Sequence, residues 1–176
     1  MNSQSLILEQ LLYRFINIKM KYMNIRDCKT VLRICNTMTS INTDFKHLRA
    51  NCKLKLKIHE QKLHFKNGQG NYHEYGTPMF IINDIDLKHV NDMSGLFQNI
   101  KTYQFYLNTF NTSNVKNMSD MFKNTYRFNQ PLKFDTSNVT DMSGMFNDAY
   151  NFDQPLKFYT SIVTDMSDMF NDAYNF

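Results

Sequence analysis

The most regular pattern of apolar and polar positions is a repeat in the second half of the chain. Residues 135–152 (DTSNVTDMSGMFNDAYNF) and 159–176 (YTSIVTDMSDMFNDAYNF) are identical at 15 of 18 positions. A third copy, NTSNVKNMSDMFKNTYRF, occupies residues 111–128, and DLKHVNDMSGLF (86–97) begins a fourth. We number them in chain order as the first to fourth repeats, beginning at residues 86, 111, 135 and 159. The sequence therefore contains an array of similar units.

Within each repeat the apolar residues fall into fixed columns. Counted from a valine, a methionine follows three residues on and a phenylalanine seven residues on, a spacing that predicts a helix. Five positions before the valine stands an aromatic residue. In the later repeats a leucine lies two residues before it with a polar residue between them, and this alternation predicts a short strand. The columns are Val90, Val115, Val139 and Val163; Met93, Met118, Met142 and Met166; Phe97, Phe122, Phe146 and Phe170; and Phe110, Phe134 and Phe158.

These columns predict how the repeats fold together. One unit of 24 or 25 residues cannot bury its own apolar side chains, whereas stacked units bury them against their neighbours. We therefore expect an α/β repeat fold, a short leucine-rich-repeat-like β/α solenoid of about four repeats over 84–176. Phe176 ends the fourth repeat before the Gln-Pro-Leu of the two preceding copies, so we expect truncation in mid-repeat. An uncovered end of this kind is expected to fray or to pair with a second copy as a homodimer.

The string TSNVTDMSGMFNDAYNFDQPL (136–156) resembles the repeat of BspA-type leucine-rich-repeat surface proteins, known as mycoplasma lipoproteins of unknown function. It is also similar to multicopy leucine-rich-repeat proteins of large DNA viruses such as insect poxviruses. The resemblance implies a non-catalytic solenoid that contacts a protein partner. Phe134 and Phe158 stand where that family usually has tryptophan, and the export or lipid-anchor signal of bacterial members is missing. The bacterial members imply an alternative function as an adhesin-like surface protein.

The first half of the chain has different patterns. Residues 1–52 predict a helical N-terminal module, with one apolar helix over 5–20 and a second that begins at Asp27 as N-cap. Residues 53–83 predict a β-hairpin and a loop, because Leu54, Leu56 and Ile58 alternate with lysines before a polar turn.

The helical module is also similar to an F-box, which implies docking to a Skp1-type adaptor of a ubiquitin ligase. The matching residues are Leu8, Leu11, Leu12, Asp27, Val31, Cys35 and Ile41. The Leu-Pro opening of the motif and the tryptophan after the cysteine are absent. The alternative is that these helices are an amphipathic cap that shields the first repeat.

Charge and composition add boundaries to this picture. The net charge of +4 divides into +8 for residues 1–82 and −4 for residues 83–176, which indicates two modules. No run of 18 apolar residues occurs, and Glu9 and Arg14 interrupt the apolar N-terminal stretch. We therefore expect no membrane span, no signal peptide and an intracellular, cytoplasmic location, in the host cytoplasm if the source is viral. The three cysteines are expected to be free thiols.

Candidate catalytic and metal-binding chemistry is sparse. Cys28, Cys35 and Cys52 with His47 lack the spacing of a zinc ribbon. Serines recur in every repeat, unlike a catalytic nucleophile, and lysines alternating with leucines fit a solvated strand face better than a nucleic-acid surface. We expect no enzyme activity, no cofactor, no metal and no nucleic-acid partner, and we expect an unidentified protein partner.

Overall fold

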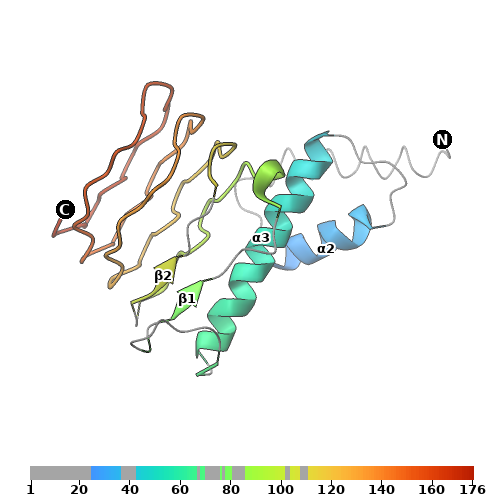
Figure 1. The fold of residues 1–176 in the computed structure, drawn as a ribbon, viewed down its shortest axis with the longest axis horizontal. Helices are drawn as coiled ribbons and strands as arrows, with labels where there is room; N and C mark the ends of the chain where they lie inside the picture. Colours follow the sequence, from blue (N-terminus) through green and yellow to red (C-terminus); the bar gives the residue numbers. More distant parts are fainter. Residues whose placement is uncertain are drawn as a thin grey trace.

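The computed structural model describes residues 25–36, 43–66, 68–69, 76, 78–80, 86–101, 104–107 and 111–176. In the described part of the chain, two helices precede a largely irregular region that has few strands (Figure 1). This region contains a large buried phenylalanine cluster. The described elements are α2 (Ile25–Cys35), α3 (Thr43–Lys66), β1 (Met79–Phe80), a short 3-10 helix (Leu87–His89) and β2 (Tyr106–Leu107). The predictions that concern Leu8, Leu11, Leu12, Ile41 and Phe110 fall outside the described residues.

Helix α2 packs on α3 through a small core of its own. Cys28, Val31 and Cys35, spaced by three and four residues, bury one face of α2 against Leu48 and Cys52 of α3. Asp27 lies inside the first turn of α2 rather than at its N-cap as predicted. There its carboxylate interacts favourably with the positive end of the helix dipole. No helix in the described part of the chain combines the length and apolarity needed to cross a membrane.

The predicted β-hairpin is wrong, because Leu54, Leu56 and Ile58 belong to helix α3, which also runs across the predicted boundary between residues 52 and 53. Leu54, Ile58 and Phe65 lie on one helix face and join the main core, whereas Leu56 packs against the core shared with α2. The alternating leucines therefore face two different cores on two sides of one helix. This tertiary arrangement overrides the strand-like pattern.

The predicted helix of each repeat is also wrong for the described residues. From each core methionine onward the chain makes successive turns, in which every second N–H donates to the carbonyl three residues back, as from Met121 to Met118. Two residues of each such segment have left-handed backbone, for example Asp120 with a φ of 54° and Asn124 with a φ of 58°. Left-handed residues cannot continue a right-handed helix, so the apolar columns are presented by turns.

The remaining N–H groups of these turns join each repeat to the next. Between the second and third repeats the donor–acceptor pairs are Met118–Asp141, Asp120–Ser143, Phe122–Met145 and Asn124–Asn147, at N···O distances of 2.8 or 2.9 Å. The other two junctions have the same four bonds, and parallel bridges connect Asp92, Asn117, Asp141 and Asp165 in order. In the opposite direction, one carbonyl per junction accepts two N–H groups of the following repeat. The four corresponding N–H groups of the fourth repeat meet no backbone carbonyl among the described residues.

Stacked phenylalanine rings fill the core of this region. Phe97, Phe122, Phe146 and Phe170 stack at centroid separations of 5.5, 5.5 and 5.6 Å. Valines and methionines of the first three repeats lie in the same cluster and are at most 1% exposed at the column positions named above. In the fourth repeat Val163 and Phe170 are partly buried and Met166 is 45% exposed. Phe134 and Phe158 are partly buried and pack against the cluster.

The described strands are fewer than predicted. β1 pairs with β2 in parallel, with Met79 opposite Tyr106, and the N–H of Tyr106 donates to the carbonyl of Pro78 over 2.8 Å. The positions that correspond to Tyr106 in the next two repeats hold Pro131 and Pro155. Proline has no N–H, so this bond cannot be repeated and the segments remain extended without strand pairing.

A steric contact accounts for the glycine at position 144, in a column where glycine alternates with aspartate. The corresponding left-handed positions are Gly95, Asp120, Gly144 and Asp168. A Cβ added to Gly144, whose φ is +59°, would lie 2.5 Å from Asp120 Oδ1. We expect Gly144→Ala to lower the free energy of unfolding by about 1–3 kcal/mol, measured by urea denaturation, because strain and a clash add together.

Two variants separate these causes. Gly95→Ala meets only the flexible end of Gln98 at 3.3 Å, so it should lose the backbone part alone. Asp120→Gly in the Gly144→Ala background should restore part of the lost stability. A double variant as unstable as the sum of its parts would show that the Asp120 contact is not responsible.

Candidate functional site

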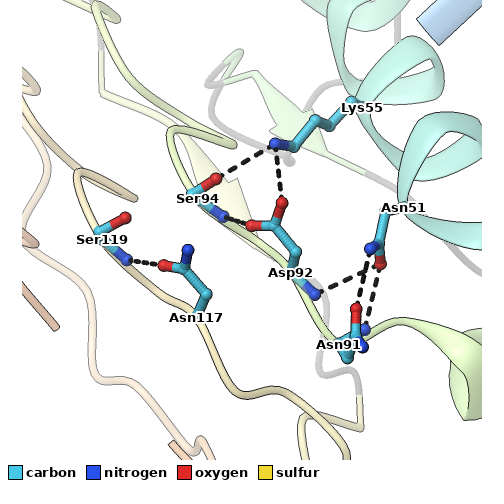
Figure 2. Close-up of polar contacts among 7 residues, drawn as sticks. All are labelled: Asn51, Lys55, Asn91, Asp92, Ser94, Asn117 and Ser119. Carbon is cyan, nitrogen blue, oxygen red and sulfur yellow. Dashed lines mark hydrogen bonds and ion pairs between the residues drawn. The ribbon is translucent and has the colours of Figure 1, made fainter. Parts of the chain in front are cut away.

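Helix α3 lies along the first repeat and presents a stripe of polar side chains to it (Figures 1 and 2). The stripe consists of His47, Asn51, Lys55 and Lys62, at helical spacings of four, four and seven residues. Their contacts follow one another along the first repeat, beginning with His47 Nδ1, which donates to the His89 carbonyl over 2.8 Å. We call this stripe and its partners the α3 cap.

Asn51 takes the place of a peptide group from a preceding repeat. At the next junction the Asn91 carbonyl accepts from the N–H groups of Lys116 and Asn117, at 2.8 and 3.2 Å. In the first repeat the corresponding N–H groups, of Asn91 and Asp92, donate to Asn51 Oδ1 at 3.1 and 3.3 Å (Figure 2). Asn51 also donates from Nδ2 to Asn91 Oδ1, and it is 4% exposed. Its side-chain amide thus satisfies donors that would otherwise be left without a partner.

Lys62 takes the place of a backbone N–H donor from a preceding repeat. In the second repeat the Lys123 carbonyl accepts from the N–H of Asn99 in the preceding repeat. The corresponding carbonyl of the first repeat, that of Gln98, accepts from Lys62 Nζ over 3.2 Å. Burial lowers the pKa of Lys62 to about 8. A charged group is kept in a poorly hydrated place because it supplies the donor that no preceding repeat provides.

Lys55 holds the centre of the α3 cap. Its Nζ lies 3.3 Å from Asp92 Oδ2 and 3.1 Å from Ser94 Oγ, and the side chains of Lys55 and Asp92 are each 12% exposed (Figure 2). Asp92 uses its other oxygen to accept the N–H of Ser94 over 2.8 Å. An ion pair this well buried is costly to break by removing one partner.

The polar columns of the repeats close turns. In each repeat the N–H of a serine donates to the side-chain oxygen two residues earlier, at 2.8–3.0 Å, in the pairs Asp92–Ser94, Asn117–Ser119, Asp141–Ser143 and Asp165–Ser167. This local bond is the Asx turn that starts the turn segment. Within the described ranges no group of three histidine, cysteine, aspartate or glutamate side chains is placed to hold a metal ion.

Comparison with known proteins identifies a family for the repeat region. A family profile described as "Mycoplasma protein of unknown function, DUF285" matches residues 72–176, more than half of the chain. The chain belongs to the DUF285 family. This match bears out the resemblance of the repeats to the mycoplasma repeat of unknown function. No curated protein and no solved structure matches the chain.

The DUF285 match covers β1 and all four repeats, but it excludes α2 and α3, which end before residue 72. The α3 cap therefore joins residues outside the family match to the first repeat inside it. The sequence pattern does not predict this site, because it places Lys55 and Lys62 on a β-hairpin, whereas both belong to α3. Their spacing of seven residues, two helical turns, was the available signal.

Exposed apolar side chains gather in the fourth repeat of this DUF285 chain. They are Tyr159, Ile162, Met166, Tyr174 and Phe176, with exposed fractions between 45% and 74%. Elsewhere in the described ranges, Leu63 is the one large apolar residue of similar exposure. Met169 of the same repeat is buried at 5% exposed.

The cysteines lie between α2 and α3 as free, buried thiols. The Cys52 thiol donates a hydrogen bond that lowers the pKa of Cys28, and the same bond together with burial raises the pKa of Cys52. Burial raises the pKa of Cys35. His47, which was considered with them as a zinc ligand, is engaged with the His89 carbonyl instead.

The structure describes three of the residues that carry the F-box resemblance, Asp27, Val31 and Cys35. Val31 and Cys35 are 0% and 2% exposed in the core between α2 and α3. These two side chains are therefore not on the surface that the described helices offer to an adaptor.

The lowered pKa of Lys62 predicts a dependence of stability on pH. Between about pH 8 and the usual lysine value of 10.5, the unfolded chain binds more protons than the folded chain, so stability rises with pH. Lys62→Met removes this rise. From pH 7 to pH 10 we expect the wild type to gain about 1–3 kcal/mol relative to this variant, measured by urea denaturation. Lys66→Met, at an exposed position of the same helix, is the control, and equal pH dependence of the two variants would contradict the prediction.

Proposed function

We propose that this chain is a non-catalytic protein-interaction protein whose residues 84–176 form a short, leucine-rich-repeat-like solenoid. Support for the solenoid comes from the junctions, where the same four backbone bonds recur between successive repeats. Support for an end to the array comes from the α3 cap, in which Asn51 and Lys62 reproduce the bonds of a preceding repeat. The helices on this view protect the first repeat.

Two exposed apolar side chains of the fourth repeat, Tyr159 and Ile162, carry the functional part of the proposal. Apolar groups that gather on one surface segment mark contact sites for other proteins. Tyr159 and Ile162 are 68% and 46% exposed, although the equivalent positions one repeat earlier hold the polar residues Asp135 and Asn138. At these two positions the fourth repeat therefore has apolar side chains where the third repeat has polar ones.

The proposal that the chain is non-catalytic has its own support. The aspartates and serines of the four repeats bond to their own turns, as in the pair of Asp141 with the N–H and hydroxyl of Ser143. A side chain that holds a turn in each repeat serves the fold rather than a reaction.

Site-specific photo-crosslinking tests this function. A benzophenone amino acid at Ile162 should give a discrete covalent product in cells of the source, because that side chain would lie in the contact. The same group at exposed Lys133 is the control and should give much less product. Equal products at both positions, or none at Ile162, would contradict the proposal.

The mass of the product separates the kinds of partner. A product of twice the chain mass would indicate a second copy, and one that contains Skp1 would support the adaptor function implied by the F-box resemblance. The intracellular location stays a prediction, which the three free cysteines support because reducing compartments keep thiols unpaired.

A further inference from the structure

A column of tyrosine rings runs along the outside of the repeats. Tyr126 and Tyr150 stack at a centroid separation of 4.5 Å with planes 2° apart, and Tyr150 and Tyr174 follow at 5.2 Å and 35°. Tyr174 is 74% exposed, and the other two rings are partly exposed. Each ring comes two residues after a left-handed residue of its repeat, so the turn geometry fixes where it stands. The column plays no part in the phenylalanine core.

The first repeat has a lysine at the position of this column. Lys101 follows the left-handed Asn99 by two residues, as Tyr126 follows Asn124. Its Nζ lies over the Tyr126 ring, 5.2 Å from the centroid, which is a cation–π contact. The chain itself therefore shows which chemical group the rings of this column attract.

Carboxylates flank the two later rings. The Tyr174 hydroxyl donates to Asp172 Oδ1 over 2.9 Å, and Tyr150 makes the same bond with Asp148. Asp172 Oδ2 also accepts from Asn171 Nδ2 over 3.2 Å. A carboxylate has about four acceptor positions, so both aspartates retain lone pairs for a cationic donor. Residues 83–176 carry a net charge of −4 and residues 1–82 carry +8, so the repeats are the part of the chain that attracts cations over a longer range.

We propose that the tyrosine column, with Asp148 and Asp172, is a docking surface for a segment of another protein that is rich in lysine or arginine. This proposal rests on the proposed function, because it gives the protein partner a chemical character. Ammonium or guanidinium groups of the segment would lie against the rings and bond the carboxylates, as the Lys101 ammonium lies on Tyr126. Cation–π contact and charge pairing together give selectivity for basic segments over neutral ones.

Peptide binding to the full chain tests the proposal. A fluorescent decalysine peptide should bind in low salt, and the same peptide with every lysine acetylated should bind at least about tenfold more weakly. Asp148→Asn with Asp172→Asn should weaken decalysine binding by about tenfold. Asparagine suits this backbone, since Asn124 occupies the corresponding left-handed position. Tyr150→Leu should have a similar effect, while Tyr150→Phe, which keeps the ring, should bind within about threefold of the wild type.

The matched control removes two charges at other positions, both in the third repeat. Asp135→Asn with Asp153→Asn changes the net charge equally, and Asn111 and Asn129 occupy the corresponding positions of the second repeat. This control should retain binding within about threefold. Equal loss in the two double variants, or equal binding of the acetylated peptide, would overturn the proposal. A crosslink at Ile162 without decalysine binding would overturn the tyrosine surface and leave the interaction function standing.

Discussion

Phe146→Ala is expected to unfold most of the repeat region, with a loss of about 3–5 kcal/mol in the free energy of unfolding. The side chain is 0% exposed and stacks between Phe122 and Phe170 at 5.5 and 5.6 Å. The lost contacts and the remaining cavity both add to the cost, which is comparable to the whole stability of a small domain. Urea denaturation followed by circular dichroism would measure the loss.

Phe170→Ala is the matched control for this prediction. Phe170 occupies the same column in the fourth repeat, where it is partly buried and has a ring of this column on one side alone among the described residues. We expect it to cost about half as much as Phe146→Ala, since less contact area is lost. Equal costs at the two positions would show that stacking between repeats does not govern the stability of the array.

Lys55→Met is expected to cost about 2–4 kcal/mol, because it leaves the Asp92 carboxylate without its cation in a site where it is 12% exposed. Asp92→Asn alone should also be destabilising, because it leaves the ammonium without its anion. The double variant should cost less than the sum of the two single variants, which is the signature of a direct pair. Additive costs in the urea-derived free energies would show that Lys55 and Asp92 act independently.

The repeat array could be predicted from the sequence, because identical residues at intervals of 24 or 25 must occupy equivalent places. The conformation of each repeat could not be read from the apolar columns, since Met142 and Phe146 have the same spacing on a helix and on this series of turns. The distinguishing signal lay in the polar residues. Gly144 and Asp148 are of the types that tolerate left-handed backbone, and the same holds at the corresponding positions of every repeat.

The α3 cap could not be predicted from the hydrophobic pattern, because α3 packs against α2 on one side and against the repeats on another. A leucine and a lysine next to each other on α3 face different environments, so Leu54 enters the core while Lys55 reaches the first repeat. A hydrophobic period assumes one buried face, and it fails where a helix is covered on more than one side. Asn51 gave no signal at all, since its role depends on backbone groups about 40 residues away.

The junction bonds give the stack an electric direction. Four N–H groups per junction point toward the fourth repeat, and two point back toward the first repeat and share one carbonyl, so each junction has a net bond direction. Lys62 donates to a carbonyl on the acceptor side of the first repeat, so its charge matches this direction. Two repeats placed with their four-donor sides together would bring N–H groups against N–H groups and could not make these bonds. Head-to-tail order satisfies the bonds, so a further copy of the unit inserted between the second and third repeats would make the same junction bonds on both of its sides.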